Sequence, residues 1–402
     1  MLLGPVGPRW AARPSGTVGG VPARSRALLA LTLLLGACAA PDPAGPPPYR
    51  LEPACPAAGA PPLASAALVN EVVARGDLPH WQAGDVGASA RLSDGRLVWV
   101  FGDTVRAPGV TPRLVANSVL VTSGTCVSQL LPPGDGPVVP DVSAGEVRWP
   151  MSVVVLPPTE PLADAGVDDV VVVLCARTER GDGTGGVLDF RFRGTSAAVF
   201  TVSAGEAPQP LEVLELTPDD PSDTQVNWGA AATVSGDWFH VYGTRLTGEP
   251  FEFGRELHVA RIPVTDPADR DSWRFWDGTR WQPDITATAP VLAADGGVSQ
   301  TLSVDEVDGT WVAVSKRGGD LSDFVWTWTA PGPTGPWTPS RALPAPAGYD
   351  TGRLTYAPLA HPEVPLRSGG LLVSVSRNTT DLAALLDRPE VGRPLFAEIP
   401  RP

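Results

Sequence analysis

The stretch that specifies the fold is a turn followed by a short apolar strand, Asp94-Gly95 leading into Leu97-Val98-Trp99-Val100-Phe101. Asp-Gly favours a tight turn, and β-branched and aromatic residues favour extended backbone. The same order of turn, apolar strand and polar exit occurs four more times along the chain. These further copies start at Asp168-Asp169, Gly236-Asp237, Asp308-Gly309 and Gly369-Gly370. Self-similarity of this kind predicts a repeat architecture.

The spacing of the copies indicates the size of the repeating unit. With Gly95, Asp168, Gly236, Gly309 and Gly370 as anchors, the intervals are 73, 68, 73 and 61 residues. Each copy has an apolar strand before the turn and another after the polar exit, which is the content of one propeller blade. The sequence therefore predicts an all-β fold, a five-bladed β-propeller. A pair of β-sandwiches is the alternative, and the regular spacing disfavours it.

The N-terminal segment has the pattern of an export signal. Arginines precede the apolar run 27–35, and Cys38 follows a small, apolar tripeptide. We expect residues 1–37 to be a lipoprotein signal peptide and Cys38 to carry the lipid. The apolar run is too short to cross a hydrocarbon core of about 30 Å. The protein is thus expected outside the cytoplasm, as a monomer anchored by lipid to the outer face of the cell membrane.

Composition divides the rest of the chain into two parts. Residues 38–62 are rich in Pro and Ala and poor in bulky residues, so we expect a disordered tether. Residues 63–402 are expected to form the propeller as one domain. The formal net charge of −14 disfavours nucleic acid as a partner, because nucleic-acid binding depends on cationic contacts to phosphate.

Three cysteines follow Cys38, which allows one disulfide and one free thiol in an oxidising compartment. We expect Cys55 to pair with Cys126. Cys175 ends an apolar run and is expected to be a packed core thiol. The four histidines show no ligand spacing, so no metal and no cofactor are predicted. The sequence also lacks the usual serine-hydrolase, zinc-protease and nucleotide-binding motifs.

Two aspartates flank the first hairpin at equal distance from its turn. Asp85 precedes Asp94 by nine residues and Asp103 follows Gly95 by eight. Equidistant positions face each other in an antiparallel pair, so the carboxyl groups are expected roughly 5 to 9 Å apart. Glycosidases place their two carboxyl groups in this range. The alternative is that each aspartate, being next to glycine, serves only as a turn residue.

The same offset in the other copies selects candidate substrate-binding residues at the same end of the propeller. They are Arg148, Trp149, Asn227, Trp228, Arg245, Gln300, Lys316, Tyr356, Arg377 and Asn378. Mixtures of amides, cations and aromatic rings are typical of sugar-binding sites. The alternative is that the arginines neutralise surface carboxylates and the tryptophans pack between blades.

The first repeat also carries a family resemblance. Gly84-Asp85-Val86-Gly87-Ala88-Ser89, followed by residues 92–104, resembles a bacterial family long classified as a domain of unknown function. Some members of that family are described as endo-D-arabinanases. The likeness extends through Trp228 with Tyr242-Gly243, through 328–337, and through 356–358 with 374–378, and so covers most of residues 80–380.

The resemblance implies a five-bladed propeller that cleaves the D-arabinan of mycobacterial-type cell walls, with Asp85 and Asp103 as its two catalytic aspartates. Gly84 departs from the family pattern, where a hydroxyl residue is expected, and this puts the substrate in doubt. We therefore predict a glycoside hydrolase acting on an arabinan-like cell-wall polysaccharide. The competing hypothesis is a non-catalytic carbohydrate-binding or cell-envelope scaffold propeller, and a third is an interaction hub with an exposed apolar patch.

Overall fold

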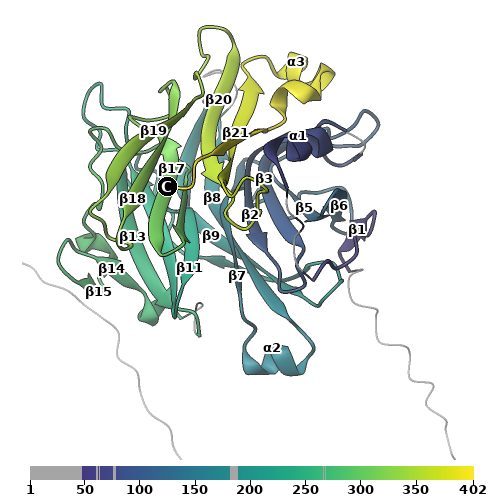
Figure 1. The fold of residues 1–402 in the computed structure, drawn as a ribbon, viewed down its shortest axis with the longest axis horizontal. Helices are drawn as coiled ribbons and strands as arrows, with labels where there is room; N and C mark the ends of the chain where they lie inside the picture. Colours follow the sequence, from purple (N-terminus) through teal and green to yellow (C-terminus); the bar gives the residue numbers. More distant parts are fainter. Residues whose placement is uncertain are drawn as a thin grey trace, which may run out of the picture. The chain divides into compact units, whose positions relative to one another are not determined.

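The structure is a computed structural model of the 402-residue chain. It describes residues 48–402 except 60, 61, 63, 76, 77, 182–188, 266 and 268. The predicted signal peptide and Cys38 lie outside these residues. The described part folds into five antiparallel sheets arranged in sequence order (Figure 1). None of its helices is long and apolar enough to span a membrane.

Blade 1 contains the stretch that specifies the fold. Its strand order is β1-β6-β5-β3-β2, with β4 paired to β3. The strands are β1 (Arg50–Glu52), β2 (Ala83–Arg91), β3 (Leu97–Val105), β4 (Leu114–Val115), β5 (Ser118–Ser123) and β6 (Cys126–Leu131). Helix α1 (Ala66–Ala74) lies between β1 and β2 in the chain.

A strand lies within the segment for which the sequence predicted a tether. A tether was expected up to residue 62, but β1 pairs antiparallel with β6 as the outermost strand of blade 1. The predicted disulfide between Cys55 and Cys126 is confirmed, with 5.7 Å between the two Cα atoms. Strand pairing and this covalent link attach a Pro-rich segment that could not fold by burial of its own side chains.

Blades 2 and 3 follow the same meander. Blade 2 has the order β10-β9-β8-β7 and blade 3 the order β11-β12-β13-β14-β15. Their elements are β7 (Glu146–Leu156), α2 (Glu160–Asp164), β8 (Asp169–Arg180), β9 (Phe190–Val202), β10 (Gln209–Glu215), β11 (Asn227–Ser235), β12 (Trp238–Arg245), β13 (Glu256–Pro263), β14 (Arg274–Trp276) and β15 (Trp281–Gln282).

Blades 4 and 5 complete the ring. Blade 4 has the order β16-β17-β18-β19, and blade 5 has three strands, β20-β21-β22. Their elements are β16 (Ser303–Val307), β17 (Thr310–Lys316), β18 (Phe324–Ala330), β19 (Thr338–Pro344), β20 (Arg353–Ala360), β21 (Leu371–Thr379), α3 (Leu382–Asp387) and β22 (Leu395–Ile399). The five predicted hairpin copies correspond to the five blades, so the propeller prediction is confirmed.

The first strands of the blades form the inner ring. In order around the axis, β2, β7, β11, β16 and β20 each contact the next, and β20 contacts β2 again. Helix α1 takes the place of a fourth strand in blade 5. The Asn70 side-chain amide donates to the Phe396 carbonyl at 2.8 Å and accepts from the Phe396 N–H at 2.9 Å, as a neighbouring strand would. The side chain thus satisfies backbone groups on the free edge of β22.

The core consists of apolar clusters between adjacent blades. Successive residues of a strand point to opposite faces, so β8 supplies both of its neighbours. Val171 and Val173 pack in the cluster shared with blade 1, whereas Val170 and Val172 pack in the cluster shared with blade 3. Cys175 is buried in the first of these clusters, as predicted. Burial of both faces explains the uninterrupted apolar run in this strand.

The inner strands share a feature that the sequence did not reveal. In blades 1, 2, 3 and 5 the pairing of the first two strands is interrupted by a β-bulge close to the start of the inner strand. Asp85, Trp228 and Tyr356 lie at or immediately before such bulges. A bulge bends the strand and redirects neighbouring side chains. We call this end of the ring the mouth; α3 and the turn leading into β20 lie there, at the top of Figure 1.

Candidate active site

Asp85 is held by groups from two blades. The Tyr356 hydroxyl of β20 donates to Asp85 Oδ2 at 2.6 Å, and the backbone N–H groups of Asp85 and Asp103 also donate to this carboxylate. Val86, the next residue, has a positive φ of 64°, which is rare for a β-branched residue. Gly102 lies directly against Asp85 Oδ1, so that any side chain there would collide with the carboxylate. The bulge and this glycine together turn the Asp85 side chain onto β3.

Asp103 lies next to Asp85 on the neighbouring strand and has different partners. Trp149 Nε1 of β7 donates to Asp103 Oδ1 at 2.9 Å, and Arg180 at the end of β8 donates to the same oxygen. Burial raises the pKa of Asp103 to about 7, the charge of Asp85 adds to this, and Arg180 and Trp149 oppose it. The pKa of Asp85 is also raised by burial, against the donation from Tyr356. The predicted proximity of the two carboxyl groups is therefore present.

A second set of groups positions Tyr356 and the bulge. Asn378 Nδ2 of β21 donates to the Tyr356 hydroxyl oxygen at 3.2 Å. The Val86 N–H donates to Ser376 Oγ at 2.9 Å, which fixes the bulge of blade 1 against blade 5. Burial and the Asp85 charge raise the pKa of Tyr356 well above its usual value, so its hydroxyl keeps the proton that it donates. Of the predicted residues, Trp149, Tyr356 and Asn378 thus gather around the aspartates.

Arg180 and Phe190 belong to this site and were not found from the sequence. Arg180 contacts Asp103, its guanidinium lies 5.8 Å from the centre of the Trp149 ring, and the Phe190 ring meets Trp149 edge-on at 5.1 Å. The offset that located Asp103, counted from Asp169 in blade 2, ends at Arg177, three residues before Arg180. Strand β8 is longer than β3 and its pairing with β9 is irregular after Arg177, so a fixed offset could not reach Arg180.

Four predicted binding residues are occupied by the protein itself, which corrects the expectation that they face a ligand. Arg148 donates to Glu215, Ser196 and the Pro140 carbonyl, and Arg377 donates to the carbonyls of Arg393 and Glu390. Trp228 is buried and packs edge-on against Phe275. Lys316 is fully buried, and its ammonium donates to the Thr355 carbonyl at 2.5 Å. These side chains connect neighbouring strands and adjacent blades.

The remaining three predicted residues lie in blade 3 and at its border with blade 4. Arg245 pairs with Glu256 at 2.7 Å. Gln300 accepts from Arg255 at 3.3 Å, and its carbonyl accepts from Thr244 at 2.9 Å. Asn227 is buried beside Thr244, and neither polar atom of its side-chain amide has a hydrogen-bond partner among the described residues. The structure does not bring these three into contact with the aspartates.

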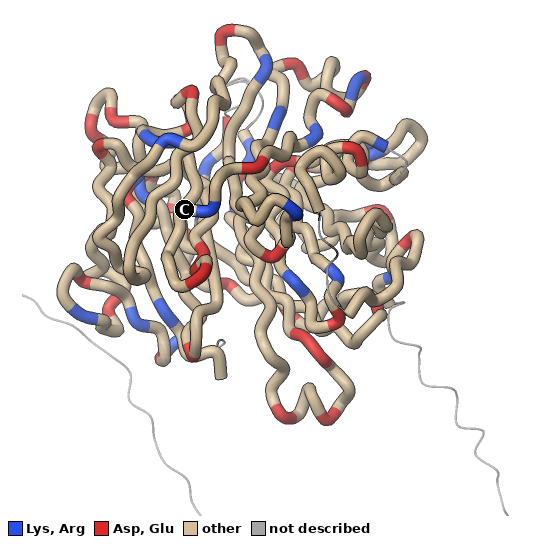
Figure 2. The backbone as a smooth tube through the Cα atoms, in the orientation of Figure 1, with Lys and Arg blue, Asp and Glu red and all other residues tan. Residues whose placement is uncertain are grey.

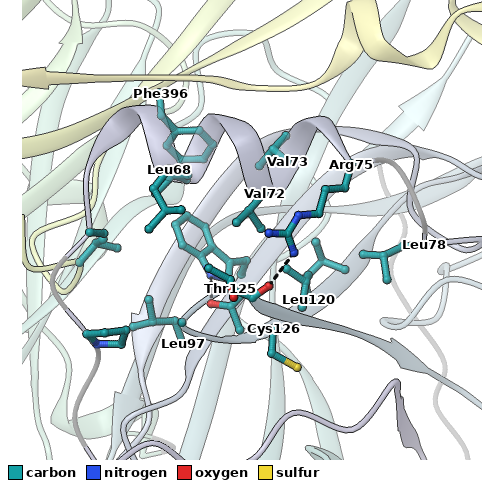
Figure 3. A pocket seen from close by; sticks show the side chains of 18 of the residues that line it. Leu68, Val72, Val73, Arg75, Leu78, Leu97, Leu120, Thr125, Cys126 and Phe396 are labelled. Atoms are coloured by element: carbon teal, nitrogen blue, oxygen red, sulfur yellow. Dashed lines mark hydrogen bonds between the residues drawn. The ribbon is translucent and has the colours of Figure 1, made fainter.

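A separate cavity of about 680 Å³ lies beneath α1, and neither aspartate lines it. Figure 3 shows Leu68, Val72 and Val73 of the helix above Leu97 and Leu120 of the sheet. Arg75 closes one side by donating to the Thr125 carbonyl at 3.2 Å. The lining is mostly apolar and, among the described residues, includes no carboxyl group.

The chemistry available at the mouth is proton transfer. The two carboxyl groups have unequal environments, because Asp85 accepts from three donors whereas burial raises the pKa of Asp103 to about 7. Pairs of titratable groups with separated pKa values are the usual equipment of acid–base catalysis. Within the described residues, no group of three His, Cys, Asp or Glu side chains is arranged to hold a metal ion.

Comparison with solved structures supports the fold. A putative hydrolase from Bacteroides ovatus superposes with a TM-score of 0.63 at 15% identity, covering 83% of this chain and 89% of that one. A glycoside hydrolase family 43 arabinoxylan arabinofuranohydrolase from Bacillus subtilis gives a TM-score of 0.50 at 14% identity, covering 81% and 66%. At these identities the likeness concerns the fold alone.

Comparison with sequences gives one curated relative and one family. The relative, Notoamide biosynthesis cluster protein J' of Aspergillus versicolor, is 28% identical over 153 residues, which is 37% of this chain and 40% of the relative. The chain thus spans less than half the length of that relative. The family described as Domain of unknown function (DUF5005) matches residues 149–400, from within the first strand of the second blade to just past the last strand of the fifth. The chain belongs to this DUF5005 family.

Proposed function

We propose that the protein is a glycoside hydrolase that uses Asp85 and Asp103 as its two catalytic carboxyl groups. The observation that carries the proposal is that the two aspartates lie on paired strands at the mouth, each with its own hydrogen-bond donors. Glycosidases use one protonated and one ionised carboxyl group on either side of the scissile bond. The hydrolase folds among the similar structures are consistent with this chemistry.

The hydrogen-bond donors around each aspartate support a different role for each. Asp85 receives hydrogen bonds from Tyr356 and from two backbone N–H groups, all of which favour the carboxylate. Asp103 Oδ1 accepts hydrogen bonds from Trp149 and Arg180, which leaves Oδ2 to carry a proton. With a pKa of about 7, Asp103 holds that proton at neutral pH or slightly below. Asp103 is therefore the general acid and Asp85 the nucleophile or base.

The reaction then follows from these positions. Asp103 transfers its proton to the glycosidic oxygen as the bond to the anomeric carbon breaks. The Asp85 carboxylate either attacks the anomeric carbon or removes a proton from the attacking water. Arg180 and Trp149 stabilise the carboxylate that forms on Asp103, and Tyr356 holds Asp85 in place.

The substrate that we propose is an arabinan-like cell-wall polysaccharide. The resemblance of residues 84–104 to endo-D-arabinanases supports it, as does the arabinose-releasing activity named for the Bacillus subtilis enzyme. Acidic residues outnumber Lys and Arg, 44 to 30, and are distributed along the whole fold (Figure 2), which suits a neutral polymer better than a polyanion. We also propose that Cys38 carries a lipid, which would hold the enzyme at the cell surface beside such a polymer.

The test is hydrolysis of purified D-arabinan and plant L-arabinan by the wild-type protein and by the Asp85→Asn and Asp103→Asn variants. We expect oligosaccharides from D-arabinan with the wild type and a loss of at least about 10³-fold with either variant. Folded protein that binds the polysaccharide but releases no product would instead support the carbohydrate-binding scaffold.

A further inference from the structure

Large apolar side chains gather on exposed loops at the mouth. Phe251 is 92% exposed and Phe253 is 57% exposed, both in the loop that joins β12 to β13. Leu321 is exposed in the loop between β17 and β18, and Tyr349 in the loop that leads into β20. We call these four residues the rim platform. They come from blades 3, 4 and 5, which face blade 1 across the ring or adjoin it (Figure 1).

The loops that carry Phe253 and Leu321 pack closely against each other and against residues 294–297. Gly319 lies so close to the Phe253 carbonyl that a side chain there would collide with it, and Gly254 lies equally close to the Ala294 carbonyl. The Gly318 N–H donates to the Gly297 carbonyl at 2.7 Å. Phe251 itself has a positive φ of 65°. Strained, tightly packed loops hold the two phenylalanine rings outward, and such strain is typical of functional surfaces.

The rim platform is connected to the aspartate pair through buried contacts. Asp320, beside Leu321, acts electrostatically on Tyr349, and its carbonyl accepts from Lys316 at 3.4 Å. Lys316 also donates to the Thr355 carbonyl, and the next residue, Tyr356, donates to Asp85. Interior contacts thus link the loop of Leu321 to β20, the strand that positions the candidate catalytic carboxylate.

The chemistry of the rim platform fits a neutral sugar chain. Glu249 and Glu252 alternate with the two phenylalanines, and Asp320 and Asp350 lie beside Leu321 and Tyr349. Carboxylates accept hydrogen bonds from sugar hydroxyls, and aromatic faces stack on the apolar faces of sugar rings. The same carboxylates repel anionic lipid headgroups, which disfavours a membrane surface as the occupant.

We propose that the rim platform is a second polysaccharide contact, which binds the polymer several sugar units away from the bond that is cleaved. The inference rests on the proposed function and extends it to the length of the substrate. A chain that reaches from Asp85 and Asp103 to Phe251 and Phe253 gains affinity that a short oligosaccharide cannot. The enzyme is therefore selective for long internal segments over short fragments.

The experiment measures kcat/KM of the full protein on D-arabinan polymer and on a short arabino-oligosaccharide. The test variant carries Phe251→Ala and Phe253→Ala, and the matched control carries Leu211→Ala, which is 50% exposed on the outer strand β10 of blade 2. We expect the ratio of polymer to oligosaccharide kcat/KM to fall about tenfold in the double variant, since each tenfold corresponds to about 1.4 kcal/mol. The control should keep the wild-type ratio.

The outcomes separate this inference from the proposed function. Wild-type cleavage with an unchanged ratio in the double variant overturns the rim platform alone. No cleavage by the folded wild type overturns the proposed function, and the rim platform falls with it. Flotation of the wild type with phosphatidylcholine–phosphatidylglycerol vesicles, lost in the double variant, would show a lipid-binding surface and also overturn the inference.

Discussion

Tyr356 of the last blade donates a hydrogen bond of 2.6 Å to Asp85 of the first blade, across 271 residues of sequence. The bond closes the ring at the same point where it orients the candidate catalytic carboxylate. Replacing Tyr356 with Phe removes the hydroxyl donor but keeps the aromatic side chain, so the fold should persist. Because a hydrogen bond to a charged group contributes about 1.5–3 kcal/mol, we expect kcat to fall about 10- to 100-fold.

The pH profile distinguishes a positioning role for Tyr356 from a purely structural one. Donation from Tyr356 lowers the pKa of Asp85, so its loss raises that pKa. Asp85 must be ionised to act, and the acidic limb of the kcat/KM profile should therefore move to higher pH in Tyr356→Phe. An unchanged acidic limb together with wild-type kcat would show that the bond serves only to close the ring.

Arg180 should affect the alkaline limb of the same kcat/KM profile. If Asp103 is the general acid, activity should decline as the pH rises through about 7, because the proton is then lost. The Arg180 charge lowers the pKa of Asp103, so Arg180→Gln should move the alkaline limb to higher pH. Arg280→Gln is the control, since the Arg280 side chain is 80% exposed in blade 3. A limb that stays in place in both variants would argue against Asp103 as the acid.

Asp103 should also lower the free energy of unfolding at high pH. Its pKa is raised to about 7 in the folded protein, so the folded state binds the proton more tightly than the unfolded state does. Ionisation in the folded protein therefore destabilises it above pH 7. Asp103→Asn removes that cost, and we expect a gain of about 1–2 kcal/mol at pH 8, discounted because the side chain is 30% exposed.

The pH dependence of that gain follows from the direction of the shift. The gain should be largest above the folded pKa of about 7 and should shrink steadily as the pH falls. It should vanish below the ordinary carboxyl value of 3.8, where both states are protonated. Melting temperatures of wild type and variant between pH 4 and pH 8 test this. A constant difference across the range would contradict a raised pKa of Asp103 in the folded protein.

The fold was predictable because its signals are local. Asp94-Gly95 and its four counterparts mark hairpins by turn chemistry, and the uninterrupted apolar run from Leu97 to Phe101 marks a strand buried on both faces. Equal distance from the turn was enough to place Asp85 opposite Asp103. The disulfide partner of Cys126 was also found correctly, because Cys175 lies inside a core strand.

The rest of the site depends on features that spacing does not record. The bulges after Trp228 and Tyr356 decide which side chains turn inward, and Trp228 packs into the core whereas Tyr356 reaches Asp85. Arg180 reaches Asp103 only because β8 extends beyond the length of β3. The sequence predicted Lys316 as a substrate-binding cation at the mouth, yet its ammonium donates to the Thr355 carbonyl. Strand length and contacts between blades therefore decide which side chains reach the aspartates, and a fixed offset from the turn does not include them.

The disulfide gives a prediction that is independent of catalysis. Cys55 and Cys126 are 71 residues apart, and their bond fixes the segment after β1 to the β5–β6 turn. Cys55→Ser should lower the free energy of unfolding by about 2–4 kcal/mol. Cleavage by a protease should then begin near β1, because this three-residue strand is the outer edge of blade 1. Hydrolysis by the folded variant should match that of the wild type.

Cys175 supplies the control for that experiment. Burial raises the pKa of its thiol to about 12, so the native protein should not react with a thiol reagent at pH 8. One thiol per chain among the described residues should appear after unfolding without reductant, because Cys55 and Cys126 are paired. Cys175→Ala should leave the protease pattern near β1 unchanged. Early cleavage at β1 in that variant as well would mean that general loosening of the blade, and not the disulfide, governs the edge.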